Sequence, residues 1–225
     1  EDGVVLATRS VDDVPGPNNL PAGVAGAWPG DAQLFNYIQG LGIDPNLQDY
    51  NDASILEFDF IPLIDNISFD FIFASEEYGT FQCDFSDAFA FFLTNNTTGV
   101  TTNLAIVPNT TTPISVITIR DNQFNPNCGS VNPEYFADYY LQDQPGGLSP
   151  LADPINFNGL TVPLTASSAV VPGQQYNIKL VVADRNDNAF DSAVFLEGGS
   201  FNFGLELGID FLISTGNALC AGNTN

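Results

Sequence analysis

Apolar and polar residues alternate over many short segments of this chain. In residues 54–61, Leu56 and Phe58 alternate with Glu57 and Asp59, so apolar side chains occupy one side of an extended backbone and carboxylates the other. This is the pattern of a β-strand that buries one face. A chain made largely of such segments buries its apolar side chains by packing one sheet against another.

The same pattern recurs along the chain, with turns rich in Pro, Gly, Asn and Asp between the segments. Two short helices are predicted, one at 31–41, where Asp31 can cap the first turn, and one at 133–141. The sequence therefore predicts an all-β fold, a jelly-roll-like antiparallel β-sandwich with one or two short decorating helices. The predicted strands are 54–61, 69–73, 88–94, 103–108, 114–120, 159–165, 175–183, 192–197 and 201–207.

A length of 225 residues suits one large β domain. The aromatic-rich pattern ends after Phe203, so we expect one domain over residues 1–203. Residues 204–225 are expected to be a C-terminal strand that opens a following domain or pairs with another subunit. No segment is long and apolar enough to span a bilayer, and a start at Glu1 without a signal peptide is expected of an exported, processed chain.

The chain is strongly acidic, with 27 Asp and Glu residues against four Lys and Arg residues and a formal net charge of −23. This charge repels nucleic acids and anionic lipids, so we expect neither as a partner, and no direct membrane insertion. Two explanations of the acidity stay open. One is solubility in salty surroundings, where salt screens the repulsion, and the other is specific binding of cations.

The absence of histidine excludes several kinds of active site. A Ser-His-Asp triad, a Cys-His dyad and a zinc site with imidazole ligands all need histidine. A carboxylate pair such as Glu76 and Glu77 could still serve a glycoside hydrolase, but neighbouring residues on a strand point to opposite faces. We therefore expect a protein that is not an enzyme, with glycoside hydrolysis as a remote alternative.

Two clusters of acidic residues, at 75–87 and 184–191, each lie in a segment that joins two predicted strands. Calcium prefers six to eight oxygen ligands from carboxylates, amides and carbonyls, and both clusters are rich in these groups. The second cluster lacks the glycine and the final glutamate of an EF-hand, so ligands would come from several loops. The predicted Ca²⁺ ligands are Glu76, Glu77, Asp87, Asp184, Asp187 and Asp191.

Asp52, Asp87 and Asp191 each stand directly before a small residue and an apolar strand. Aspartate often accepts hydrogen bonds from its own turn, so simple turn capping is an alternative explanation of these positions. Both explanations stay open from the sequence.

The chain has three cysteines, too few for a scaffold held by many disulfides. Cys83 and Cys128 lie in polar, loop-like segments that could meet and form a disulfide. Cys220 is then left without a partner.

Several separated segments resemble, in order, the choice-of-anchor L domain family of bacterial secreted and cell-surface proteins. The most specific are Phe-Ala-Ser-Glu-Glu-Tyr at 73–78 and Asp-Ala-Phe-Ala-Phe-Phe-Leu at 87–93. The others lie at 3–6, 16–19, 30–34, 52–60, 103–108, 171–174 and 191–197. The resemblance implies an extracellular protein of the bacterial cell surface, supplies no catalytic residues, and likens the tail to the start of an immunoglobulin-like repeat.

The sequence thus predicts a binding or adhesion module stabilised by calcium, whose ligand is a glycan or a protein on another surface. Aromatic residues outside the predicted strands are candidates for its contact surface. These residues are Trp28, Tyr37, Tyr50, Tyr135, Tyr139 and Tyr140. An alternative is a subunit of an extracellular fibre that binds copies of itself by donating a strand from the region of residues 205–214.

Overall fold

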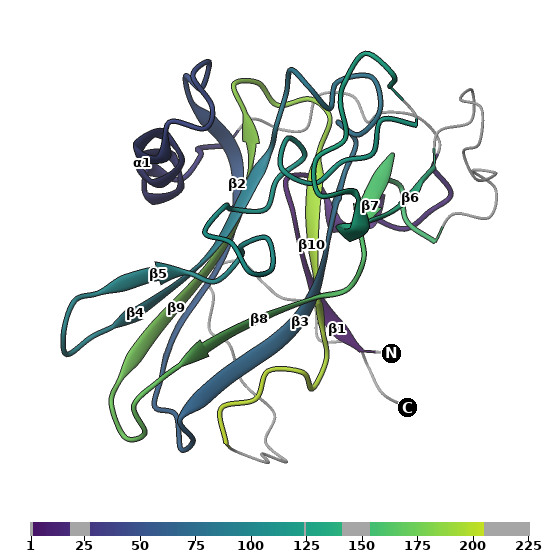
Figure 1. Ribbon diagram of the computed structural model, residues 1–225. Helices are drawn as coiled ribbons and strands as arrows, with labels where there is room; N and C mark the ends of the chain where they lie inside the picture. Colours follow the sequence, from purple (N-terminus) through teal and green to yellow (C-terminus); the bar gives the residue numbers. More distant parts are fainter. Residues whose placement is uncertain (1, 19–27, 124, 141–153, 205–225) are drawn as a thin grey trace.

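The fold is a sandwich of two antiparallel sheets, described by a computed structural model over residues 2–18, 28–123, 125–140 and 154–204 (Figure 1). The six-stranded sheet has the order β1-β10-β3-β7-β6, with β8 also pairing with β3, and the four-stranded sheet has the order β2-β9-β4-β5. The predicted all-β sandwich is therefore confirmed. The strands are β1 (Gly3–Ala7), β2 (Tyr50–Phe60), β3 (Asn66–Ser75), β4 (Ala88–Asn95), β5 (Thr101–Asn103), β6 (Phe136–Tyr139), β7 (Gly159–Thr161), β8 (Leu164–Ala169), β9 (Tyr176–Arg185) and β10 (Ser192–Glu197).

Phenylalanines at alternate positions fill the space between the sheets. Phe71 and Phe73 of β3 face Phe89 and Phe91 of β4, and all four side chains are buried. Phe71 and Phe91 meet edge to face with ring centroids 4.9 Å apart, and Phe73 stacks on Phe89 at 4.9 Å. Such pairs stabilise a fold by about 0.5–1.5 kcal/mol beyond the burial of their area. The alternation in the sequence therefore determines which face of each strand is buried.

Within the described residues, one α-helix, α1 (Ala32–Leu41), covers the outer face of the four-stranded sheet (Figure 1). Asp31 caps its start by accepting a hydrogen bond from the Leu34 amide at 2.8 Å, as expected. Leu34 and Ile38 are buried against the sheet. Lys179 of β9 is paired with Asp31 at 2.5 Å, which ties the start of the helix to the sheet.

The second predicted helix, at 133–141, is wrong. A 3-10 turn at Pro133–Tyr135 leads directly into β6, whose backbone pairs with β7. The tertiary pairing with β7 overrides the local helical pattern.

Two of the predicted strands, at 103–108 and 114–120, are also wrong. The ladder ends at Asn103 because its side-chain oxygen accepts the Phe91 and Ala105 amides, at 2.9 and 3.0 Å. Residues 114–120 form a turn, in which the Ser115 carbonyl accepts the Thr118 and Ile119 amides. Most of the apolar side chains in both segments are buried all the same, among them Val107, Ile114 and Ile119, which explains the strand-like pattern.

Three further differences separate the predicted strands from the observed ones. Strand β1 was not among the predicted strands, and the predicted strand at 159–165 is divided into β7 and β8. In the predicted strand at 201–207, the described part forms only a single bridge between Asn202 and Ser68. Except for Gly204, the predicted C-terminal segment 204–225 and Cys220 lie outside the described residues. In the described part, no helix is long and apolar enough to cross a membrane.

Candidate functional site

At one end of the sandwich the residues between the sheets change from apolar to polar. On the four-stranded sheet, Asp184 lies two positions beyond the core residue Val182 of β9, and Asp87 lies two positions before Phe89 of β4. Asp52 belongs to the irregular part of the neighbouring strand β2. All three aspartates are fully buried. The alternation that buries phenylalanines thus also buries carboxylates where the strands continue past the core.

The six-stranded sheet presents hydroxyl groups at the same end. Thr8 follows β1, Ser75 ends β3 and Ser192 begins β10, and all three are fully buried. The Ser192 hydroxyl donates a hydrogen bond to Asp87 Oδ2 at 2.7 Å, which joins the two sheets. Carboxylates of the four-stranded sheet therefore meet hydroxyls of the six-stranded sheet at this end of the sandwich.

The two acidic clusters predicted from the sequence form one buried site. Arg185, next to Asp184, donates its backbone amide to Asp87 Oδ1 at 3.0 Å, and Asp87 donates its own amide to Glu77 at 3.0 Å. The buried acidic residues of the described chain are Asp52, Glu76, Glu77, Asp87, Asp184 and Asp191. We call these residues the buried acidic cluster. It contains five of the predicted calcium ligands together with Asp52, which was not among them.

Asp187 is the predicted ligand that the structure does not bury. It is exposed, and its Oδ1 accepts a hydrogen bond from the Ala189 amide at 3.0 Å, two residues further on. This is local turn capping, an explanation that the sequence suggested for Asp52, Asp87 and Asp191 and not for Asp187. Asp52 and Asp87 differ from it because they accept amides from remote parts of the chain, those of Trp28 and Arg185. Turn capping therefore explains Asp187 but not the buried aspartates.

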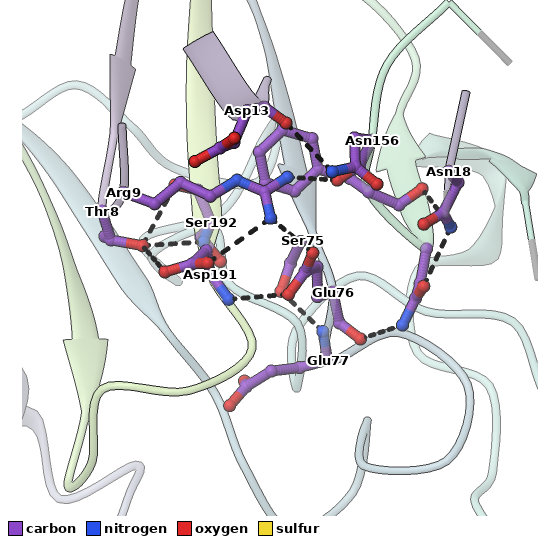
Figure 2. A network of polar contacts seen from close by, with 12 residues as sticks. Thr8, Arg9, Asp13, Asn18, Ser75, Glu76, Glu77, Asn156, Asp191 and Ser192 are labelled. Atoms are coloured by element: carbon purple, nitrogen blue, oxygen red, sulfur yellow. Dashed lines mark hydrogen bonds and ion pairs between the residues drawn. The ribbon is translucent and has the colours of Figure 1, made fainter. Parts of the chain in front are cut away.

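Arg9 neutralises part of the buried acidic cluster (Figure 2). Its Nη1 lies 2.6 Å from Glu76 Oε1 and 3.4 Å from Asp191 Oδ2, and all three side chains are buried. The Asp191 amide also donates to Glu76 Oε2 at 3.2 Å. The guanidinium carbon lies 4.5 Å from the centre of the Phe157 ring. Arg9 thus compensates two carboxylates of the cluster, a role that the sequence did not reveal because Arg9 lies far from both in the chain.

A second guanidinium group is paired outside the cluster. Arg185 Nη2 donates to Asp44 Oδ1 at 2.7 Å, its Nε donates to the other oxygen of Asp44, and its Nη1 donates to the Asp84 carbonyl at 3.3 Å. The charge of Arg185 is therefore matched mainly by Asp44. This leaves Asp52, Glu77, Asp87 and Asp184 without an ion pair among the described residues.

Asp184 is the most poorly compensated of these groups. Among the described residues, no hydrogen bond of normal geometry reaches either of its carboxyl oxygens or Asp52 Oδ2, although the Thr8 hydroxyl lowers the pKa of Asp184 to some extent. Removing a charged group from water without such partners is costly, so it binds a proton or a cation instead.

Burial raises the pKa of several of these carboxyl groups. It raises the pKa of Asp184 to about 12, with the Asp87 charge as the next cause, and that of Asp87 to about 8. Burial also raises the pKa of Asp191 to about 6, although the nearby Arg9 lowers it, and it raises the pKa of Glu77 well above its ordinary value. Without a cation, the site would therefore hold protons at neutral pH.

No group of three or more Cys, Asp or Glu side chains in the described part of the chain is arranged to hold a metal ion. A calcium ion here would use fewer carboxylates and take its remaining ligands from hydroxyl, amide or backbone carbonyl oxygens. The calcium assignment stays a prediction.

A disulfide holds the loop that covers the site. Cys83 and Cys128 are bonded, with Cα atoms 5.7 Å apart, and Asn125 donates to the Gly79 carbonyl at 2.9 Å. The Phe81 ring packs on the Phe190 ring at 4.6 Å. The loop between β3 and β4 is thereby fastened to the loop between β9 and β10.

The expected aromatic contact surface is largely absent. Tyr50, Tyr139 and Tyr140 are buried, and Tyr37 packs edge to face on Phe92. Trp28 keeps 36% of its surface exposed, and it lies beside the buried acidic cluster.

In the comparison with protein families, the model described as Choice-of-anchor L domain matches residues 1–202. Neither the curated proteins nor the solved structures gave a match.

Proposed function

Because the chain belongs to the choice-of-anchor L domain family, it is a module of bacterial cell-surface proteins, and we propose that it is an extracellular binding or adhesion module stabilised by calcium. In this proposal, calcium stiffens the acidic end of the sandwich, and the loops at that end present a contact surface to a glycan or a protein on another surface.

The main support for this proposal is that buried carboxyl groups outnumber buried guanidinium groups. The buried acidic cluster has six carboxyl groups, whereas Arg9 is the one cation of the described residues that forms ion pairs with it. Buried like charges raise one another's pKa, and a divalent cation relieves both this repulsion and the cost of burial. The side chains of the cluster offer only oxygen ligands, and the chain contains no histidine, which favours calcium over zinc or copper.

Binding is proposed in preference to catalysis because the acid pair considered from the sequence is buried. Glu76 is fully buried and paired with Arg9, and Glu77 is buried and accepts the Asp87 amide. A general acid and base for glycoside hydrolysis must reach a bound sugar. These two groups are instead suited to holding the loop in place.

Calcium should raise the melting temperature of the purified domain. A ligand that binds only the folded state stabilises it by about 2.7 kcal/mol at a concentration of 100 times its Kd. For a domain of this size, that corresponds to roughly 5–10 °C. Thermal unfolding would be followed by circular dichroism in excess calcium and in excess chelator, with magnesium and a matched sodium concentration as controls.

Sodium at the same ionic strength separates the two explanations of the acidity. An equal rise in calcium and in sodium would mean general screening of the surface charge, and it would contradict the calcium proposal. No rise in either salt would contradict it as well.

A fibre subunit is a second candidate, favoured by the outer edge of β2. Among the described strands, β2 pairs only with β9, and its other edge is bridged at its start, between Asn51 and Pro29. Ile55, further along β2, is exposed. A donated strand could pair there. However, Glu57 and Asp59 are also exposed along β2, and a strand from an equally acidic copy would place like charges opposite them. Electron microscopy of the purified chain would show filaments if strand donation occurs and single particles if it does not.

A further inference from the structure

Three carboxyl oxygens of the buried acidic cluster stand out because no hydrogen bond of normal geometry from a described residue reaches them. They are both oxygens of Asp184 and Oδ2 of Asp52. Every other cluster member accepts a hydrogen bond or belongs to an ion pair. Both side chains are fully buried, so water at the molecular surface does not reach them. Buried polar atoms normally have partners, which makes these three oxygens the natural ligands of a bound cation.

The topology places these two aspartates on adjacent strands. Asn51 of β2 lies opposite Asp184 of β9, and the register then shifts between Asn51 and Ser54. Asp52 is within this irregularity and has a φ of 51°, which is unfavourable for a residue with a side chain. Such strain persists where the surrounding structure holds it, often at ligand sites.

Asp52 also connects the site to Trp28. Asp52 Oδ1 accepts the Trp28 amide at 2.6 Å, and the Asp52 amide donates to the Trp28 carbonyl at 2.9 Å. The Trp28 indole donates to the Ala53 carbonyl at 3.1 Å. Trp28 is therefore fastened to β2 at Asp52, the residue with the positive φ.

We propose that one calcium ion binds between Asp52 and Asp184, and that it fixes the Trp28 segment to β2 through Asp52. The ligands of this site differ from the calcium ligands predicted from the sequence, because Asp52 is included and the exposed Asp187 is not. It agrees with the absence of a three-carboxylate cluster among the described residues, since two carboxylates supply three oxygens and the other ligands are neutral. The proposal rests on the calcium-stabilised function proposed above and gives that calcium its position.

Terbium luminescence tests this position, because Tb³⁺ replaces Ca²⁺ at oxygen sites and emits when a nearby indole transfers energy to it. Trp28 is the only tryptophan in the chain. Selective excitation of Trp28 should therefore produce terbium emission that excess calcium abolishes. Asp52→Asn and Asp184→Asn should each weaken terbium binding at least about tenfold, since even the loss of an outer-sphere partner costs 10–100-fold. The matched controls Asp187→Asn and Asp138→Asn remove the same charge at exposed positions and should leave binding unchanged.

The outcomes separate this inference from the proposed function. If calcium raises the melting temperature of the wild-type protein but Trp28 sensitises no terbium emission, the calcium lies elsewhere and only the inference is overturned. The same holds if both buried variants bind terbium as the wild type does. If calcium neither stabilises the protein nor competes with terbium, both proposals fail. Trp28→Phe should lose the sensitised emission while it keeps the calcium-dependent stabilisation.

Discussion

Arg9→Met should lower the free energy of unfolding by about 3–5 kcal/mol, the usual cost of removing one partner from a buried ion pair. Methionine keeps much of the apolar packing against Phe157 but leaves Glu76 and Asp191 without their cation. At about 2–4 °C per kcal/mol, the melting temperature should fall by roughly 6–20 °C. Urea unfolding followed by circular dichroism would measure the loss directly.

A double variant and a matched control show whether the lost charge is responsible. Glu76→Gln added to Arg9→Met should restore part of the stability, because it removes one of the two unpaired carboxylates. Arg120→Met makes the same substitution where the guanidinium donates to the Gly129 and Ile117 carbonyls and not to a carboxylate. It should cost only about 1 kcal/mol. Equal losses at Arg9 and Arg120 would contradict a special role of Arg9.

In chelator, the stability of the domain should fall as the pH rises from about 5 to about 8. Asp87 and Asp191 have pKa values of about 8 and about 6 in the folded protein, raised by burial above the ordinary value of 3.8. Asp184, at about 12, keeps its proton throughout this range. The folded state therefore binds more protons than the unfolded state, so stability is greatest below the ordinary pKa of aspartate and declines as the pH rises through the folded values.

The expected size of this pH effect is large, because each pH unit over which the folded state holds one extra proton changes the stability by about 1.4 kcal/mol. The melting temperature should drop by at least about 10 °C between about pH 5 and pH 8. Excess calcium should remove much of this decline, because the cation replaces the protons. Asp184→Asn should also flatten the profile measured in chelator. A stability that increases with pH in chelator would be incompatible with protonated carboxyl groups in the folded protein.

The sheets of this protein could be predicted from its sequence because their core consists of alternating phenylalanines. Residues such as Phe71 and Phe91 indicate both the strand and its buried face. The failures occur where side chains compete with the backbone ladder, as at Asn103, or where a distant strand decides the local structure, as β7 does for β6. A local sequence pattern indicates neither the competing side-chain hydrogen bonds nor the pairing with a distant strand.

Most of the acidic residues of the candidate site could be named from the sequence, but the contacts that bring them together could not. The acidic loops were visible in the sequence, whereas the contact between Asp87 and the Arg185 amide depends on the pairing of β4 with β9. The parts played by Arg9 and Asp52 depend in the same way on partners far along the chain. The repeated pattern of aspartate before a small residue was the one available signal for Asp52, and turn capping explained it equally well.

The pairing of β1 with β10 determines how this domain would respond to a pulling force. Gly3 lies opposite Glu197, so the chain enters β1 and leaves β10 at the same end of an antiparallel pair. Tension applied before β1 and after β10 would open their hydrogen bonds one after another, from Gly3 toward Ala7. The opening would then reach Arg9, whose ion pairs with Glu76 and Asp191 hold the chain at the far end of the strand. On a cell surface under flow, the Arg9 ion pairs would resist further unfolding after β1 has separated from β10.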